Sequence, residues 1–129
     1  MRMGIQSGSE RILEFYQRPN KPGLINRSAS ILRSFKEFGL ICDYDIIIDN
    51  PVETSEDIID TLNLLYNLKR PFNVGIFALR AIPNTELADE LLARSIHVTD
   101  IKTSYLSCAP TLANCMVYLV CTFRPPKRI

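Results

Sequence analysis

Apolar runs and helical repeats alternate along the first 95 residues of the chain. Short apolar runs, one of them with three consecutive isoleucines, suit buried strands. These runs are residues 3–6, 41–48 and 74–79. Between them, apolar side chains recur every three or four positions, which predicts helices. The predicted helices are residues 10–16, 24–38, 54–68 and 86–94.

Helix boundaries are also predicted by local residue patterns. Ser7 followed by Glu10 forms a capping-box pattern, and Thr54 opens a second capping pattern with the acidic residues after it. Gly39 should end the second helix. The apolar positions expected to form the stripe of that helix are Leu24, Ile31, Leu32, Phe35 and Phe38.

Strands that alternate with helices through short loops favour right-handed βαβ units and a parallel sheet. Three such units form half a barrel or a small open sheet. Beyond Ser95 the pattern weakens, and residues 111–123 fit a helix by length and spacing but a strand by their β-branched and aromatic residues. We predict a helix there, followed by a basic, solvated tail at residues 124–128.

Composition narrows the classes of function. Of 129 residues, 47% are apolar and 22% charged, as in a globular domain. With 15 basic and 14 acidic side chains the formal charge is +1, which gives no basic surface of the kind that binds nucleic acid. The apolar stretch 112–121 is too short for the ~20 residues that span a bilayer. We therefore expect neither a nucleic-acid nor a membrane partner.

The cysteines do not predict a disulfide framework. The chain begins without an apolar secretory segment, so we expect free thiols and a cytoplasmic protein. His97 is the single histidine, which excludes a His-rich metal site and a Ser-His-Asp triad within the chain. The expected role of the four cysteines is packing as small apolar side chains. They are Cys42, Cys108, Cys115 and Cys121.

Polar clusters follow each predicted strand, where parallel α/β sheets bind ligands. Ser7, Thr54 and Thr85 are explained equally well as helix caps, because each helix start leaves unpaired N–H groups. Gln6 carries a long amide that can donate and accept at once. It suits a small polar ligand or, alternatively, a hydrogen bond in the core.

Charged residues within or just after the isoleucine-rich strand need partners. Asp45 lies inside the strand, where a carboxylate is costly unless it meets a cation or several donors. Arg18 is the candidate partner, either as a buried ion pair or because both residues reach into a common ligand cavity. Glu53 and Asp49 could form an acid–base pair, but a role for Glu53 at the positive end of a helix is favoured.

Four blocks of residues, in this order along the chain, carry a resemblance to a known family. They are residues 4–13 (GIQSGSERIL), 18–19 (RP), 44–54 (YDIIIDNPVET) and 82–87 (IPNTEL). Together they resemble the second half of the core of radical S-adenosylmethionine enzymes, in particular the subgroup that carries a cobalamin-binding domain. The resemblance implies a partial, half TIM-type barrel of three βα units, with a C-terminal helical extension.

The resemblance also implies a site for S-adenosylmethionine. In the similar oxygen-independent coproporphyrinogen oxidases, the positions that correspond to Gln6, Arg18 and Asp45 contact this cofactor. Their chemistry fits, because a guanidinium suits the methionyl carboxylate and amide or carboxylate oxygens suit the ribose diol. The end of the second predicted strand and the backbone after the third would cradle the adenine. The predicted cofactor-binding residues are Gln6, Ser7, Arg18, Asp45, Ile48 and Arg80.

The chain departs from the family in the parts that perform radical chemistry. The family holds a [4Fe–4S] cluster on a Cys-x3-Cys-x2-Cys loop, which this chain lacks, as it lacks the Gly-Gly-Glu motif of the family's second strand. Cys108, Cys115 and Cys121 have the wrong spacing. We therefore expect this chain to ligate neither the cluster nor cobalamin, and to be inactive alone.

Two hypotheses follow for the function. In the first, residues 1–95 correspond to strands four to six of a radical S-adenosylmethionine barrel and form the nucleoside and ribose wall, with residues 96–129 as an extension. The parent enzyme would cleave S-adenosylmethionine reductively to a 5′-deoxyadenosyl radical, or use cobalamin to transfer a methyl group. In the second, the chain is a non-catalytic half-barrel that dimerises or docks on a separate cluster-bearing chain, since open sheet edges need covering.

Overall fold

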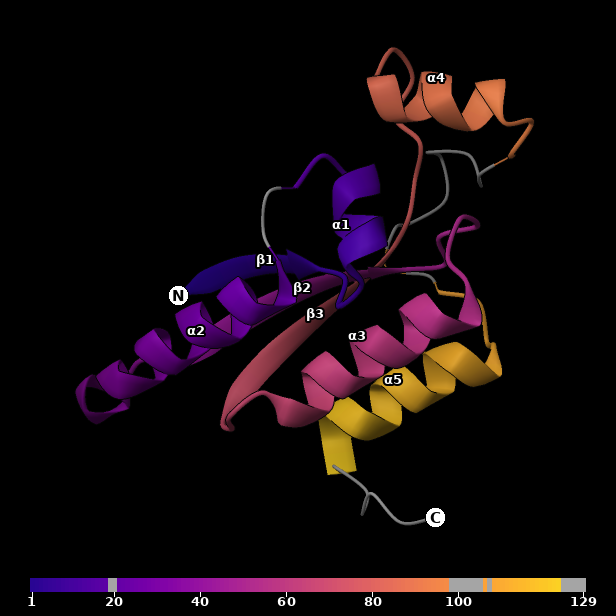
Figure 1. The fold of residues 1–129 in the computed structure, drawn as a ribbon. Coiled ribbons are helices and arrows are strands. Elements are labelled where there is room, and N and C mark those ends of the chain that lie inside the picture. Colours follow the sequence, from indigo (N-terminus) through magenta and orange to yellow (C-terminus); the bar gives the residue numbers. More distant parts are fainter. Residues whose placement is uncertain (19–20, 98–105, 107, 124–129) are drawn as a thin grey trace.

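The computed structural model describes residues 1–18, 21–97, 106 and 108–123. It is an α/β structure with a three-stranded parallel sheet in the order β1-β2-β3 (Figure 1). The strands are β1 (Arg2–Gln6), β2 (Cys42–Ile48) and β3 (Phe72–Ala78). The helices are α1 (Glu10–Phe15), α2 (Pro22–Ser34), the 3-10 helix η1 (Phe35–Phe38), α3 (Ser55–Asn67), α4 (Glu86–Ala93) and α5 (Leu112–Phe123). The α/β class and the parallel sheet are confirmed, and the half barrel stays a prediction.

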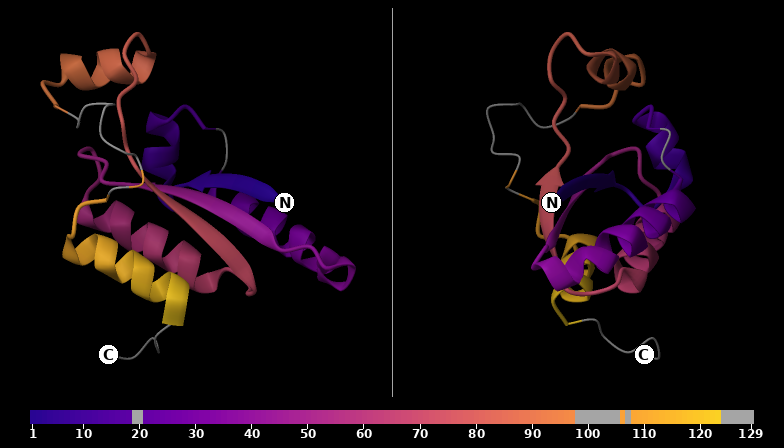
Figure 2. Two further views of the ribbon diagram at one scale, coloured as in Figure 1. Left: turned by 180° about the vertical axis from the view of Figure 1, so that it is seen from behind. Right: turned by 90° about the vertical axis from the view of Figure 1, so that its left-hand side faces the viewer.

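One face of the sheet packs against helices. Figures 1 and 2 show α2, α3 and α5 on the same side of the sheet, with α4 apart from it, beyond the carboxyl ends of the strands. In β2, buried and half-buried residues alternate, as a strand with one covered face requires. Buried side chains of the sheet and of the helices form one hydrophobic core, which includes Ile5, Leu13, Ile25, Tyr44, Ile46, Leu65 and Val117.

The capping predictions are mostly confirmed. Thr54 caps α3 through a complete capping box with Asp57, and Thr85 caps α4. Gly39 takes a left-handed conformation, with φ of 74°, where η1 ends. The cap of α1, however, is Ser9 and not Ser7, because the hydroxyl of Ser9 accepts from the backbone N–H at the third helical position.

The predicted stripe of the second helix was wrong for four of its five residues, and only Leu32 of that set packs against the core. The residues that face the core are Ile25 and Ala29, with Leu32 packed beside them. The helix carries two adjacent apolar stripes, and the sheet can cover only one of them. The uncovered stripe comprises Leu24, Ile31, Phe35 and Phe38, which are 45–78% exposed.

The predicted C-terminal helix is confirmed as α5. Figures 1 and 2 show it running alongside α3, and Val117 and Val120 enter the core. Arg70 fixes its far end by donating to the carbonyl oxygens of Val120 and Thr122, at 2.7 and 3.1 Å. Within the described part of the chain, no helix combines the length and the apolar character needed to cross a membrane. The predicted basic tail lies outside the described residues.

Candidate functional site

The sheet face opposite the helices carries charged, amide and glycine residues; we call it the polar face. Along β2, Asp43, Asp45 and Ile47 alternate with the buried core residues and therefore share this face. The register adds the neighbours of these residues from the two outer strands. The polar face comprises Arg2 and Gly4 from β1, Asp43, Asp45 and Ile47 from β2, and Asn73, Gly75 and Phe77 from β3.

Asp45 lies between two glycines at the middle of the polar face. The strand register pairs Asp45 with Gly4 on one side and with Gly75 on the other. A Cβ on Gly75 would approach within 2.5 Å of the Asp45 Oδ1 and 2.8 Å of the Phe77 ring. The carboxylate therefore leans over Gly75, and neither outer strand places a side chain beside it in this row.

Arg2 is the partner of Asp45, in place of the predicted Arg18. Its Nε donates to Oδ2 at 2.6 Å and its Nη2 to Oδ1 at 2.9 Å, a two-point pairing of guanidinium and carboxylate. The guanidinium carbon also lies 5.7 Å from the centre of the Phe77 ring. Arg2 can reach Asp45 because it lies on the adjacent strand, one alternate position away on the same face, whereas Arg18 follows the end of α1.

Gln6 turns its amide onto the polar face. It has a positive φ of 71°, and the pairing of β1 with β2 is irregular between Gly4 and Gln6. A Cβ on Gly4 would lie 3.5 Å from the Gln6 Cδ and closer still to the amide nitrogen. The absence of a side chain on Gly4 therefore lets the Gln6 amide fold back toward the Asp45 row.

The structure does not bring the other predicted cofactor-binding residues onto this face as a set. Ser7 is fully buried, and its hydroxyl forms a hydrogen bond with the hydroxyl of Thr61 at 3.1 Å. The side chain of Ile48 belongs to the core, on the opposite side of the sheet from Asp45. Arg18 is exposed after α1, and Arg80 is half-buried just after β3, with Nη1 donating to the carbonyl of Leu79 at 2.8 Å.

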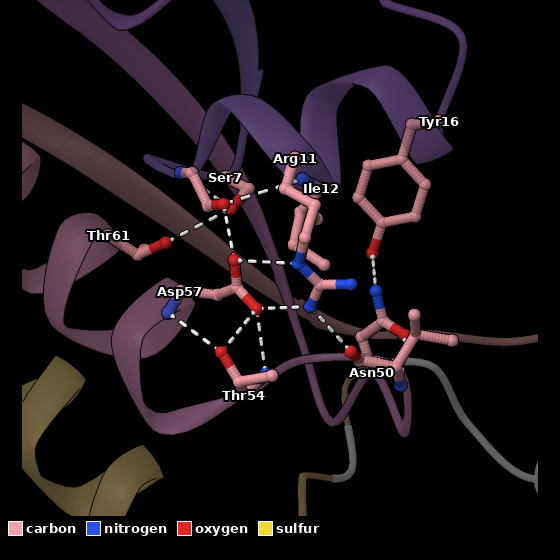
Figure 3. A network of polar contacts seen from close by, with 10 residues as sticks. Ser7, Arg11, Ile12, Tyr16, Asn50, Thr54, Asp57 and Thr61 are labelled. Atoms are coloured by element: carbon pink, nitrogen blue, oxygen red, sulfur yellow. Dashed lines mark hydrogen bonds and ion pairs between the residues drawn. The ribbon is translucent and has the colours of Figure 1, made fainter.

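A buried polar network joins the loop after β1 to the loop after β2 (Figure 3). Its centre is Asp57, which is 4% exposed. The Asp57 carboxylate accepts from Ser9 Oγ at 2.5 Å, from Thr54 N at 2.7 Å and Oγ1 at 2.8 Å, and from the Arg11 guanidinium. Arg11 also donates to the carbonyl of Val52 at 2.7 Å. The network holds the segment that follows Gln6 in place against α3.

The capping pattern revealed only part of this network. Thr54 and Asp57 are three residues apart, and that spacing predicts their mutual hydrogen bonds. Arg11 and Ser9 lie 46 and 48 residues from Asp57, so no local pattern indicates those contacts. Arg11 therefore joins Arg2 among the residues that sequence reasoning missed.

The pKa values of two carboxyl groups in this region are shifted in opposite directions. Burial works to raise the pKa of Asp57, but the hydrogen bonds from Arg11, Ser9 and Thr54 outweigh it and hold that pKa well below its usual range. Burial raises the pKa of Glu53 to about 7, and the nearby Asp57 carboxylate adds to the rise.

Glu53 lines a pocket of about 220 Å³ on the helix side of the β2 carboxyl end. Asp49, which also lines it, accepts from Asn114 Nδ2 at 2.6 Å and from the Ala109 N–H at 2.8 Å. Asp49 is thus hydrogen-bonded to the segment that enters α5, and its two hydrogen bonds to described residues do not involve Glu53. The geometry gives the two carboxyl groups different surroundings instead of an acid–base pair.

The described cysteines are free thiols and do not form a cluster. Cys42 is buried in the core, Cys115 is exposed, and Cys108 and Cys121 are half-buried against the core. Within residues 1–18, 21–97, 106 and 108–123, no three His, Cys, Asp or Glu side chains lie where they could hold a metal ion. The described donor set does not fit an iron–sulfur cluster.

The comparison with known proteins gives a partial similarity. Over 84 residues the chain is 36% identical to threonylcarbamoyladenosine tRNA methylthiotransferase MtaB of Treponema pallidum (strain Nichols). The matched segment is 65% of this chain and spans 17% of the length of that protein. No protein-family model matches the chain. The similarity to a methylthiotransferase supports the resemblance to radical S-adenosylmethionine enzymes, and it does not support the cobalamin-binding subgroup in particular.

Proposed function

We propose that the row Gly4–Asp45–Gly75 of the polar face, with the Gln6 amide beside it, is the ribose-binding wall of an S-adenosylmethionine site, contributed by a fragment of a radical S-adenosylmethionine enzyme. The observation that carries the proposal is the row Gly4–Asp45–Gly75, in which a carboxylate lies between two residues without side chains. The Gln6 amide, folded over Gly4, adds a donor and an acceptor beside it. Two of the residues chosen from the sequence thus lie within one small area of the sheet.

The chemistry of this area fits the nucleoside half of S-adenosylmethionine. Arg2 uses one acceptor position on each Asp45 oxygen, and an ionised carboxylate offers about four, so about two stay available to ribose hydroxyls. The two glycines leave room for the Gln6 amide and the Asp45 carboxylate to lie close to the backbone of the outer strands. When bound, S-adenosylmethionine would supply the 5′-deoxyadenosyl group; this chain's residues would orient its sugar.

The reaction of the parent enzyme belongs to the same proposal. The similarity to MtaB favours methylthio transfer to a modified adenosine in tRNA over the cobalamin-dependent methyl transfer that the sequence also suggested. Both reactions are those of whole enzymes, and the segment of this chain that matches MtaB spans 17% of the length of MtaB. The cluster that starts radical chemistry would have to come from residues other than those described.

Isothermal titration calorimetry with S-adenosylmethionine tests the proposed site. Asp45→Ala should weaken binding by at least about tenfold, the loss expected when hydrogen bonds to a charged group are removed. The matched control is Asp43→Ala, on the same strand and face, where the carboxylate accepts from Asn73 Nδ2 at 2.8 Å, away from the glycine row. Equal binding by the wild type and Asp45→Ala, or equal losses in both variants, would contradict the assignment.

The second candidate function is a non-catalytic module that pairs with another chain. Among the described strands, β1 and β3 each pair with β2 alone, which leaves two sheet edges with unused N–H and C=O groups. Such edges favour association with a second copy or with a separate cluster-bearing half. Sedimentation velocity over a range of concentrations checks the homo-oligomer, and a well-folded monomer at all concentrations would count against it.

A further inference from the structure

We infer that Arg2 is a positioning residue of the proposed ribose site: it fixes the Asp45 carboxylate in the orientation that receives the two ribose hydroxyls. The inference rests on the proposed function and adds a residue that the family resemblance did not indicate. Arg2 contacts both carboxylate oxygens of Asp45, at nitrogen–oxygen distances of 2.6 and 2.9 Å. The expected effect of Arg2 on a nucleoside is therefore indirect, through the carboxylate.

The pairing determines how the carboxylate is turned. Because Nε meets Oδ2 and Nη2 meets Oδ1, the planes of guanidinium and carboxylate are linked at two points, and rotation about the Asp45 side-chain bonds would break at least one of them. The remaining acceptor positions of both oxygens then point away from Arg2. A vicinal diol, with two hydroxyl donors on adjacent carbons, is the ligand group that matches a carboxylate held in this way.

Arg2 itself is supported from a second direction. Its guanidinium lies over the Phe77 ring of β3, so the side chain spans from β1 across Asp45 to the far strand. Gly75 leaves room for the two groups that Arg2 contacts, because a Cβ built there would come within 2.5 Å of Asp45 Oδ1 and 2.8 Å of the Phe77 ring. Arg2, Asp45, Gly75 and Phe77 thus form one arrangement, and removing Arg2 frees the carboxylate to turn.

The other acidic side chain of the polar face does not take the place of Asp45. Asp43 lies in the preceding row and accepts from Asn73 Nδ2 at 2.8 Å. Arg2 stands opposite Asp43 in the register but forms its two-point pairing with Asp45. Arg2 therefore orients Asp45 and not Asp43. Ligand binding by variants of Arg2 and Asp45 tests the effect of this pairing.

The experiment compares two ligands that differ only in the diol. Calorimetric affinities for adenosine and for 2′,3′-dideoxyadenosine are measured with the wild type, Arg2→Ala, Arg2→Lys and Asp45→Ala. Arg2→Ala should weaken adenosine binding by about two- to fivefold, as expected for an exposed pair, and leave dideoxyadenosine binding unchanged. Arg2→Lys keeps the charge without the planar fork, and its adenosine affinity should lie between those of the wild type and Arg2→Ala.

Arg94→Ala is the matched control. Arg94 also pairs with a carboxylate, that of Glu90 at 2.5 Å, and lies 5.5 Å from the centre of an aromatic ring, that of Phe15, but it is remote from the polar face. Its removal should change neither affinity. Circular dichroism and a urea titration of each variant verify folding; should Arg2→Ala not fold, Arg2→Lys carries the same comparison.

The outcomes separate the inference from the function on which it rests. If the wild type binds adenosine, Asp45→Ala weakens that binding, and the Arg2 variants do not, Arg2 has no positioning role and the inference fails while the proposed function stands. Equal losses for both ligands in Arg2→Ala would indicate direct contact with the base and would also overturn it. If the wild type does not distinguish the two ligands, the proposed ribose site fails, and the inference with it.

Discussion

Replacing Asp57 by asparagine should destabilise the fold by about 2–4 kcal/mol, because it removes one partner from a buried, charge-assisted network. The carboxylate is 4% exposed and receives donors from Ser9, Thr54 and Arg11. Asparagine keeps one acceptor oxygen but turns an amide N–H₂ toward groups that are themselves donors. The Arg11 side chain is 49% exposed, so solvent screens its interaction with Asp57. The expected loss of stability is therefore smaller than for a fully buried ion pair.

Equilibrium urea unfolding, followed by circular dichroism, measures this loss. The matched control is Glu56→Gln, one residue away in the same first turn of α3 but exposed, which should stay within about 0.5 kcal/mol of the wild type. If the free energy of unfolding of Asp57→Asn also stays within about 0.5 kcal/mol of the wild type, the network is refuted as a source of stability. A lower transition midpoint at an unchanged slope is the expected result.

The pH dependence of the same variant has a definite sign. The pKa of Asp57 is lower in the folded than in the unfolded chain, so the ionised carboxylate stabilises the fold above its ordinary pKa of about 4. That contribution is lost as the pH falls toward the depressed folded value. The difference between wild type and Asp57→Asn should therefore be full at neutral pH and shrink in acid.

Two further predictions concern Glu53 and Gly75. The pKa of Glu53 is raised from 4.5 to about 7, so the folded chain favours the protonated carboxyl group. The stability that this protonation contributes is lost as the pH rises from 4.5 through 7. Glu53→Gln should therefore flatten the pH dependence of the urea midpoint over this pH range. In Gly75→Ala the new Cβ, 2.5 Å from Asp45 Oδ1, should displace the carboxylate and weaken adenosine binding in calorimetry. Gly23→Ala, whose Cβ would meet no atom within 4 Å, should bind as the wild type, and equal binding by both variants would refute the role of Gly75.

The covered side of the sheet could be predicted because its pattern is local. The isoleucine-rich run predicts β2, and the length and spacing of residues 111–123 predict α5; both are confirmed. The rotation of α2 could not be predicted in the same way, since Ile25 and Leu24 head two adjacent apolar stripes. Only contact with a sheet, which covers a single stripe, selects between them.

The contacts of the polar face depend on strand register, which residue spacing does not contain. Asp45 could be identified as costly within a strand, but its partner is Arg2, 43 residues away on the neighbouring strand. The irregular pairing between Gly4 and Gln6 shifts the register within β1 itself. A one-residue difference in that register would have turned Arg2 to the core side, so the pairing could be found only once the strands were aligned.

The composition of the central row argues that the polar face has a role besides completing the fold. Glycine within a strand weakens it, because it adds backbone entropy to the unfolded chain and provides no side chain to pack. A carboxylate within a strand adds a desolvation cost that Arg2, 62% exposed, offsets only in part. Alanine or valine in place of Gly4 and Gly75, with an apolar residue in place of Asp45, would remove these costs from an isolated sheet. The present residues instead let the Gln6 amide lie over Gly4 and the Asp45 carboxylate lean over Gly75, in the orientation that Arg2 fixes. These costs to the sheet are what the proposed binding of a diol would explain.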